Sequence, residues 1–351
     1  MQRYGVLVVD DSSFMRRSIS LILERDPQFF IAGIARDGVE AIEKVQRLKP
    51  DIVTMDVEMP EMDGLTALKK IMEISPVPVV MLSNYTEEGA DITIRALEQG
   101  AVDFFLKSEL IGHDVEEKTI NNFLRKLKMI VESARVPHRE VKGSGGKDAK
   151  SGKGNFTATG KSVDLVIIGA STGGPAALQS ILPFFPKDTR VPILVLQHMP
   201  PGFTKSLAER FDTFCSLHVK EAENGDVLEA GKIYIAPAGF QTTFSKGSDD
   251  IVRLRVKDMP NEKTLYKPSV NITLNSAAPI YRDRLLTVIL TGMGNDGLAG
   301  CRTVKKYNGH VIVESEESCI VYGMPKAIYE AGLADIQVAL PDVFGKIMLY
   351  I

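Results

Sequence analysis

The sequence lacks a long apolar run, and no stretch approaches the roughly 20 residues that a membrane-spanning helix needs. It has three cysteines, too few and too scattered for a disulfide framework, so we expect reduced thiols in a cytoplasmic protein. Its five histidines lack metal-ligand spacing, which argues against a structural zinc site. The two charge signs are nearly balanced: the net charge of -3 gives no electrostatic reason to bind nucleic acid or a membrane surface.

The chain is long enough for two domains. It has 351 residues, of which 44% are hydrophobic and 25% charged, as in ordinary globular proteins. Residues 135–161 are rich in Gly, Lys and Ser and lack apolar periodicity, so we expect a flexible basic linker there. A solvated tether is the simpler interpretation, although its lysines could contact an acidic surface. We therefore predict one domain over residues 1–134 and another over 162–351.

Short apolar runs alternate with helical patterns through the first domain. Five strand–helix units in series predict an α/β fold with a doubly wound parallel sheet covered by helices on both faces. The expected strands are Val6–Val9, Phe30–Ala35, Asp51–Asp56, Pro78–Leu82 and Ala101–Leu106, and a last helix is expected over Val115–Ala134.

Polar side chains follow the carboxyl ends of these strands, where ligands bind in parallel sheets. Asp10, Asp11 and Asp56 would repel one another without a cation, and oxygen-only ligands favour Mg²⁺. Any one of these residues is more simply a helix cap or a turn residue. Together with Ser83 and Lys107 at two further strand ends, they predict a binding site.

At these residues the segment resembles a two-component receiver domain with a flavodoxin-like fold. The resemblance implies that Asp56 accepts a phosphoryl group from a histidine kinase, and that Asp10, Asp11 and Asp56 hold Mg²⁺. It also implies that Ser83 and Lys107 contact the phosphoryl oxygens and that Phe104 is the switch aromatic. A proline usually follows the lysine; here Ser108 does, so we expect a trans peptide and a different loop.

The second domain opens on an apolar run, Leu165–Ile168, that ends in the glycine-rich turn Gly169–Pro175 with Ser171 inside it. Such a strand, turn and helix start can bind phosphate, pack closely, or expose a nucleophilic serine. Further apolar strands predict a second doubly wound, Rossmann-like α/β unit. The expected strands are Val191–Leu196, Lys232–Pro237, Leu285–Leu290 and Gly309–Glu314; a hairpin over 244–255 and helices over Ala176–Leu182, Ser269–Ala278 and Met324–Ala331 are also expected.

Three residues suited to hydrolysis follow strands of this second sheet. Ser171, His198 and Asp296 would face the same sheet edge. An imidazole can take the serine proton near neutral pH, and a carboxylate can fix the tautomer of the imidazole. Separately, His198 and Asp296 are more simply turn residues. In combination they favour a catalytic triad, whose chain order differs from that of α/β-hydrolases.

Longer motifs make this domain similar to the catalytic domain of the chemotaxis protein-glutamate methylesterase family. They are Gly-Ala-Ser171-Thr-Gly-Gly, Gln-His198-Met-Pro, Tyr-Ile-Ala-Pro (234–237), Lys267-Pro-Ser-Val, Leu-Thr-Gly-Met293-Gly-Asn-Asp296-Gly and Tyr-Gly-Met-Pro (322–325). The resemblance implies hydrolysis of glutamate γ-methyl esters on chemoreceptors, with release of methanol, and deamidation of receptor glutamines. It implies no cofactor for the esterase reaction, a receiver that blocks the cleft until it is phosphorylated, and a monomer.

Backbone N–H groups at Thr172 and Met293 are the candidate oxyanion donors, although Met293 is equally a packing residue. Gln241, Asn271 and Glu314 depart from the family pattern without removing a triad member. Two alternatives stay open. One is a receiver-regulated serine hydrolase of another ester or amide, and the other is a non-enzymatic response regulator with a binding output domain. The C-terminal segment Pro341–Ile351 is expected to form a closing strand or helix.

Overall fold

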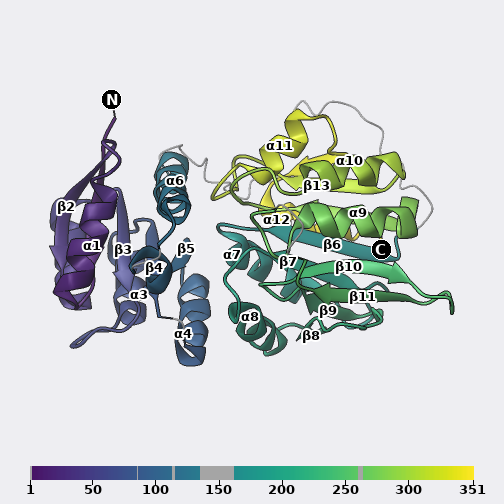
Figure 1. The fold of residues 1–351 in the computed structure, drawn as a ribbon, viewed down its shortest axis with the longest axis horizontal. Coiled ribbons are helices and arrows are strands. Elements are labelled where there is room, and N and C mark those ends of the chain that lie inside the picture. The colour runs from purple at the N-terminus through teal and green to yellow at the C-terminus, as the bar shows by residue number, and fades with distance from the viewer. Residues whose placement is uncertain (1, 85, 113–114, 135–161, 260–263) are drawn as a thin grey trace, which may run out of the picture.

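The computed structural model describes residues 2–84, 86–112, 115–134, 162–259 and 264–351, and the predicted linker 135–161 lies outside the described residues. Two parallel sheets, each flanked by helices, organise these residues (Figure 1). Among the described residues, no helix is both long enough and apolar enough to cross a membrane.

The first sheet has five parallel strands in the order β2-β1-β3-β4-β5. Its central strands are buried throughout, as expected for a sheet with helices on both faces. Polar N-caps start the helices: Ser12, Asp37 and Asp63 each accept a backbone N–H from the first turn. The elements are β1 (Tyr4–Val9), α1 (Ser13–Leu23), β2 (Phe29–Ala35), α2 (Gly38–Leu48), β3 (Ile52–Asp56), α3 (Gly64–Ile74), β4 (Val79–Ser83), α4 (Glu87–Glu98), β5 (Asp103–Leu106), α5 (Lys107–Leu110) and α6 (Glu117–Ala134).

The second sheet has seven parallel strands in the order β14-β13-β12-β6-β7-β9-β8. A separate antiparallel hairpin, β10–β11, lies beside it. The elements are β6 (Leu165–Ala170), α7 (Gly174–Gln179), η1 (Leu182–Phe184), β7 (Ile193–Gln197), α8 (Phe203–Asp212), β8 (His218–Glu221), β9 (Lys232–Ile235), β10 (Gln241–Lys246), β11 (Val252–Lys257), α9 (Val270–Tyr281), η2 (Arg282–Arg284), β12 (Leu285–Ile289), α10 (Leu298–Lys306), β13 (His310–Glu314), α11 (Met324–Glu330), β14 (Ile336–Val338) and α12 (Leu340–Ile347).

Both predicted α/β sheets are confirmed, with local differences in the second one. The helix expected over Ala176–Leu182 is divided between α7 and η1, with Pro183 in the 3-10 turn. The strands β8 and β14 and the helix α10 were not predicted. The C-terminal segment forms the helix α12, one of its two expected forms.

The two units lie against each other, with α4, β5 and α6 of the first turned toward the second (Figure 1). Phe104 on β5 packs against Phe203 on α8, with ring centroids 4.5 Å apart. Arg210 Nε donates to Glu98 Oε1 at 2.8 Å, which joins α8 to α4. One buried apolar cluster includes side chains of both units, so the interface is continuous with the two cores.

Candidate active site at the domain interface

The strands β12, β6 and β7 are neighbours in the second sheet, and the three predicted triad residues follow their carboxyl ends. Ala170 pairs with Gln197 in register, which places Ser171 beside His198, and His198 N–H donates to the Ala170 carbonyl at 3.0 Å. The chain builds outward from β6 in both directions, so this is the topological switch point of the sheet, where ligands bind in open α/β folds.

The turn that carries Ser171 is held by backbone hydrogen bonds. The Ser171 N–H donates to the Thr291 carbonyl at 3.0 Å. The Ser171 carbonyl accepts from Gln197 Nε2 at 2.9 Å and from Gly174 N–H at 2.8 Å. A Cβ on Gly174 would lie 2.0 Å from Gln197 Oε1, so only glycine fits there. Because the peptide is planar and trans, these bonds also fix the direction of the Thr172 N–H.

Gln197 is fully enclosed and joins the two halves of the site. Its Nε2 also donates to the His198 carbonyl at 3.0 Å, so a single amide group holds the backbone of both Ser171 and His198. The prediction from sequence did not include Gln197 as a site residue, although it precedes His198 in the Gln-His-Met-Pro motif.

His198 and Asp296 are hydrogen bonded, with Nε2 and Oδ2 3.0 Å apart. Asp296 also accepts from Ser269 Oγ at 2.9 Å and from the N–H groups of Val270 and Asn271 at 2.7 and 3.0 Å, at the start of α9. Burial favours the neutral acid, but the bond to His198 and these N–H groups outweigh it, and the pKa of Asp296 is lowered.

An ionised Asp296 accepts only, so His198 Nε2 carries the hydrogen and Nδ1 keeps its lone pair. Nδ1 is buried and has no hydrogen-bond partner among the described residues. Nδ1 is thus available as the base. No hydrogen bond joins it to Ser171 Oγ within the described ranges, although both residues line the same cavity.

This cavity has a volume of about 390 Å³ and lies between the two units. Ser171 is 4% exposed at its wall. The second unit contributes Ser171, His198, Met199, Pro200, Pro201, Gly239, Thr264, Leu265, Tyr266, Lys267 and Met293, and the first unit contributes Asp103, Phe104, Phe105, Glu109, Asn122 and Lys126. The first unit therefore covers the site that the second one builds.

The first unit also bonds to the turn behind Ser171. Thr172 Oγ1 donates to Asp103 Oδ2 at 2.8 Å, and Lys126 Nζ lies 2.9 Å from the same oxygen. The Gly173 N–H donates to the Val102 carbonyl at 3.2 Å. These bonds join Thr172 and Gly173, which follow the candidate nucleophile, to the start of β5 and to the residue just before it.

The two candidate oxyanion donors differ in their surroundings. In the part of the chain that the structure describes, no hydrogen bond takes up the N–H of Thr172 or of Met293. The Met293 side chain is buried in an apolar cluster with α6 residues of the first unit. The role of both N–H groups as oxyanion donors stays a prediction.

The three departures from the family pattern have structural roles. Asn271 Oδ1 accepts from the N–H groups of Gly297 and Gly300 at the start of α10, at 3.0 and 2.8 Å. Gln241 is buried; its Nε2 donates to the Tyr266 carbonyl at 2.8 Å, and its Oε1 accepts the Ser269 N–H at 2.9 Å.

The third departure, Glu314, lies behind the nucleophile turn. Its Oε2 accepts the Thr291 N–H at 2.8 Å, and its Oε1 accepts from Ser318 Oγ at 2.9 Å. Burial raises the pKa of Glu314. Thr291 in turn holds Ser171 through its carbonyl and Thr172 through its hydroxyl.

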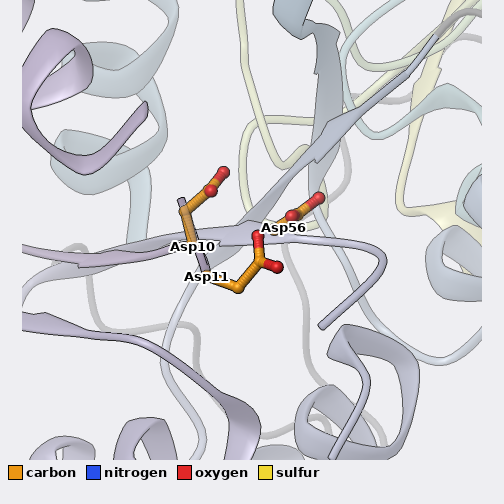
Figure 2. Close-up of side chains that lie close together, drawn as sticks. All are labelled: Asp10, Asp11 and Asp56. Carbon is orange, nitrogen blue, oxygen red and sulfur yellow. The ribbon is translucent and has the colours of Figure 1, made fainter. Parts of the chain in front are cut away.

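A second site lies at the edge of the first sheet. Asp10, Asp11 and Asp56 each offer a carboxylate oxygen, and these oxygens lie within 4.8 Å of one another (Figure 2). Lys107 Nζ lies 2.8 Å from Asp10 Oδ2 and 2.6 Å from Asp56 Oδ2. Burial raises the pKa of Asp56 to about 6, against the opposing effect of Lys107. Three clustered carboxylates form a hard-oxygen donor set that fits Mg²⁺.

The other two predicted receiver residues, Ser83 and Phe104, lie on β4 and β5. Ser83 Oγ accepts from Thr93 Oγ1 on α4 at 2.9 Å. Phe104 is buried against Phe203 of the second unit. Ser108 lies in the short helix α5, and the only cis peptide bond among the described residues is Lys267–Pro268, so the expected trans bond is confirmed.

The fold and the two sites together define a response regulator in which a receiver domain is joined to a Rossmann-like α/β domain. A family model described as a response regulator receiver domain matches residues 6–113. A second model, described as CheB methylesterase, matches residues 166–347. The chain belongs to the CheB methylesterase family.

Individual relatives agree with this assignment. The chain is 43% identical over 334 residues to a protein-glutamate methylesterase/protein-glutamine glutaminase of Thermotoga maritima, covering 94% of this chain and 93% of that protein. A Pyrococcus horikoshii protein of the same name is 43% identical and covers 97% and 92% of the two chains. The crystal structure of the Thermotoga maritima CheB methylesterase catalytic domain matches with a TM-score of 0.52 and 44% identity, over 54% of this chain and 100% of that one.

Proposed function

We propose that the chain hydrolyses glutamate γ-methyl esters of chemoreceptors, releasing methanol, and deamidates receptor glutamines during chemotactic adaptation. The observation that carries this proposal is the His198–Asp296 hydrogen bond, with His198 and Ser171 lining the same cavity. The names of the relatives support the substrate class. In this proposal residues 1–134 form the receiver, 135–161 a linker and 162–351 the catalytic domain.

The proposed reaction uses the three residues in sequence. Ser171 Oγ forms a bond to the ester carbonyl carbon as its proton passes to His198 Nδ1, and Asp296 stabilises the imidazolium through Nε2–H. The tetrahedral intermediate breaks its bond to the methoxy oxygen, which leaves as methanol with the proton from His198. Water then attacks the acyl-enzyme, with His198 as base, and frees the glutamate. With glutamine the leaving group is ammonia.

The N–H groups of Thr172 and Met293 stabilise the oxyanion in this scheme. Each such donor typically supplies about 2.7–4 kcal/mol of transition-state stabilisation. This role of Thr172 is supported by the fixed direction of its N–H. The direction is fixed because the Ser171 carbonyl, in the same peptide plane, accepts two hydrogen bonds.

The receiver controls access in this proposal. Its residues Asp103, Phe104 and Lys126 wall the cavity that contains Ser171, so the structure corresponds to a covered site. A histidine kinase supplies the phosphoryl group: an Asp56 oxygen bonds to phosphorus as the phosphohistidine P–N bond breaks. Asp10, Asp11 and Asp56 would hold Mg²⁺, which would offset charge on the phosphoryl oxygens.

A path from Asp56 to the interface supports this control. A phosphoryl oxygen competes for the hydrogen of the Ser83 hydroxyl, which now donates to the carbonyls of Asn84 and of Gly89 on α4. The helix α4 packs on α7 and α8 and ends at Glu98, the partner of Arg210. Rearrangement at Ser83 therefore shifts the docking equilibrium of the helix nearest the catalytic domain.

Methanol release from methylated chemoreceptor tests the proposal. Full-length protein with Mg²⁺ and a phosphodonor releases methanol, and the Ser171→Ala variant does not. Ser180→Ala is the matched control, because this exposed serine at the end of α7 donates its hydroxyl to the Ala176 carbonyl and is not among the residues that line the cavity. Equal release from wild type and Ser171→Ala contradicts the catalytic assignment.

Removal of residues 1–140 tests the covering role of the receiver. The truncated protein is expected to show higher basal activity than the unphosphorylated full chain, since the cavity loses its first-unit wall. Unchanged or lower activity in a folded truncated protein contradicts occlusion.

A further inference from the structure

Tyr266 lies face to face with the candidate base. Its ring centroid is 4.2 Å from that of His198, and the two planes differ by 7°. Tyr266 lies just before the cis Lys267–Pro268 bond and lines the cavity that contains Ser171. Tyr266 has no role in the proposed reaction of Ser171, His198 and Asp296.

Several groups hold Tyr266 in place. Its carbonyl accepts from the buried amide of Gln241 at 2.8 Å, and its N–H donates to Thr264 Oγ1 at 3.2 Å. Gly294 leaves room for the ring, because a Cβ there would lie 3.0 Å from the Tyr266 hydroxyl oxygen. The position of the ring is thus fixed by hydrogen bonds to the Tyr266 backbone and by the space beside Gly294.

The face of an aromatic ring carries partial negative charge and attracts a cation within about 6 Å of its centroid. His198 becomes a cation when it takes the Ser171 proton, and the stacked ring is within that distance. Stacking also restricts rotation of the imidazole about an axis that the Asp296 bond alone leaves free. Both effects favour the protonated imidazole in the orientation that the reaction needs.

We propose that Tyr266 is a positioning residue that holds the plane of His198 and stabilises its protonated form through this face-on contact. The inference rests on the proposed role of His198 as the base. It extends that role by adding an aromatic partner to the carboxylate.

Other charged groups also face His198 and bear on its titration. Asp296 bonds to Nε2, and the cavity wall brings in charged side chains from both units. Three of these side chains are in ion pairs: Lys126 with Asp103, and Lys267 with Asp258. The wall groups are Asp103, Glu109, Lys126 and Lys267. Substitution of Tyr266 leaves all of them in place, so the difference between variants isolates the ring.

The test uses full-length protein with Mg²⁺ and a phosphodonor. Methanol release from methylated chemoreceptor gives kcat and KM as a function of pH. NMR titration follows the His198 imidazole signal, assigned by its loss in His198→Ala. The variants are Tyr266→Leu, Tyr266→Phe and, as a control in the same segment, Leu265→Ala, whose side chain lines the cavity and is 63% exposed.

We expect Tyr266→Leu to lower kcat about tenfold and to move the His198 titration midpoint to lower pH by about 0.5–1. Tyr266→Phe keeps the ring face and stays within about twofold of wild type in kcat. Leu265→Ala leaves the titration midpoint in place. An unchanged midpoint and kcat in Tyr266→Leu overturn the inference, and so does a loss confined to KM.

A shape-conserving variant covers the case in which Tyr266→Leu does not fold. Trifluorophenylalanine at position 266 keeps the ring but removes the negative charge from its face. Behaviour like that of Tyr266→Phe contradicts the electrostatic role; a lowered midpoint supports it. If wild-type protein releases no methanol, the proposed function fails, whereas the NMR titration still decides whether the ring stabilises the imidazolium.

Discussion

Replacement of Asp56 by asparagine is expected to stabilise the receiver domain at neutral pH without Mg²⁺. Asp56 is 3% exposed, and its pKa is raised from 3.8 to about 6, chiefly by burial. The folded state therefore binds the Asp56 proton more tightly than the unfolded state. The contribution of Asp56 to the free energy of unfolding is therefore highest below about pH 4. It falls as the pH rises to about 6, because Asp56 then has to ionise inside the folded protein.

The magnitude follows from the same values. A rise from 3.8 to about 6 corresponds to about 3 kcal/mol lost on ionisation, at 1.36 kcal/mol per pH unit. The asparagine amide resembles the protonated acid in shape and carries no charge. We therefore expect Asp56→Asn to gain up to about 3 kcal/mol in unfolding free energy at pH 7.5, and almost nothing at pH 4.

Hydrogen exchange of the full-length protein measures this gain locally. The slowest amides of β1 and β3 should exchange about a hundredfold more slowly in Asp56→Asn at pH 7.5 without Mg²⁺. Addition of Mg²⁺ should reduce the difference, since the cation stabilises ionised Asp56 in the wild type. Glu58→Gln, an exposed carboxylate two residues away, is the matched control.

Two results refute this reasoning. One is equal protection in wild type and Asp56→Asn at pH 7.5, which would mean that Asp56 ionises without cost. The other is a gain of the same size at pH 4 and pH 7.5, which would mean that charge is not its cause.

Three further substitutions probe the interface and the support of the nucleophile turn. Asp103→Ala removes the acceptor of the Thr172 hydroxyl, so basal methanol release without phosphodonor should rise about tenfold; Asp91→Ala, exposed on α4, is its control. Gln197→Leu should lower kcat at least about tenfold while the receiver still accepts phosphate, because the Ser171 and His198 carbonyls both lose the bond from the Gln197 amide. Glu314→Gln should raise the unfolding temperature at pH 8 but not at pH 4, because burial raises the pKa of Glu314.

Each of these predictions can fail plainly. Wild-type basal release in Asp103→Ala would show that this hydrogen bond does not hold the covered state. Full kcat in Gln197→Leu would show that the turn is fixed by other bonds. A gain for Glu314→Gln that does not depend on pH would trace its effect to packing.

The sequence was most informative where a buried strand ends in polar residues. Leu165–Ile168 is a continuous apolar run, and Leu285–Leu290 is apolar apart from Thr287. Their composition and length predict buried strands, and so place Ser171 and Asp296 at one edge of a parallel sheet. The same reasoning brought Asp10 and Asp56 together, which the structure shows within one carboxylate cluster.

Elements with weaker apolar character were missed. The strand β8 is at the sheet edge, with an exposed first residue and mixed polarity, so it has no continuous apolar run. The helix α10 follows Gly297, which has φ +100°. Its first turn contains an alanine and a glycine, Ala299 and Gly300, so the sequence shows no clear helical repeat of large apolar residues there. The sequence signal in each case was weaker than the tertiary contacts that form the element.

Contacts between distant residues were beyond reach from the sequence. Thr172 and Asp103 are 69 residues apart, and their hydrogen bond depends on how the two units dock. The Tyr266–His198 stack depends on a loop that the Gln241 amide holds and that Gly294 leaves room for, and nothing in the sequence pairs Tyr266 with His198. Docking and loop course are set by the whole fold, and no local pattern encodes them.

The most direct test of the account is methanol release from methylated chemoreceptor by three full-length proteins, with Mg²⁺ and with or without phosphodonor. We predict that the phosphodonor increases release by wild type, that Asp56→Ala stays at the basal rate in both conditions, and that Ser171→Ala releases none. Release by Ser171→Ala at the wild-type rate would contradict the account at its centre.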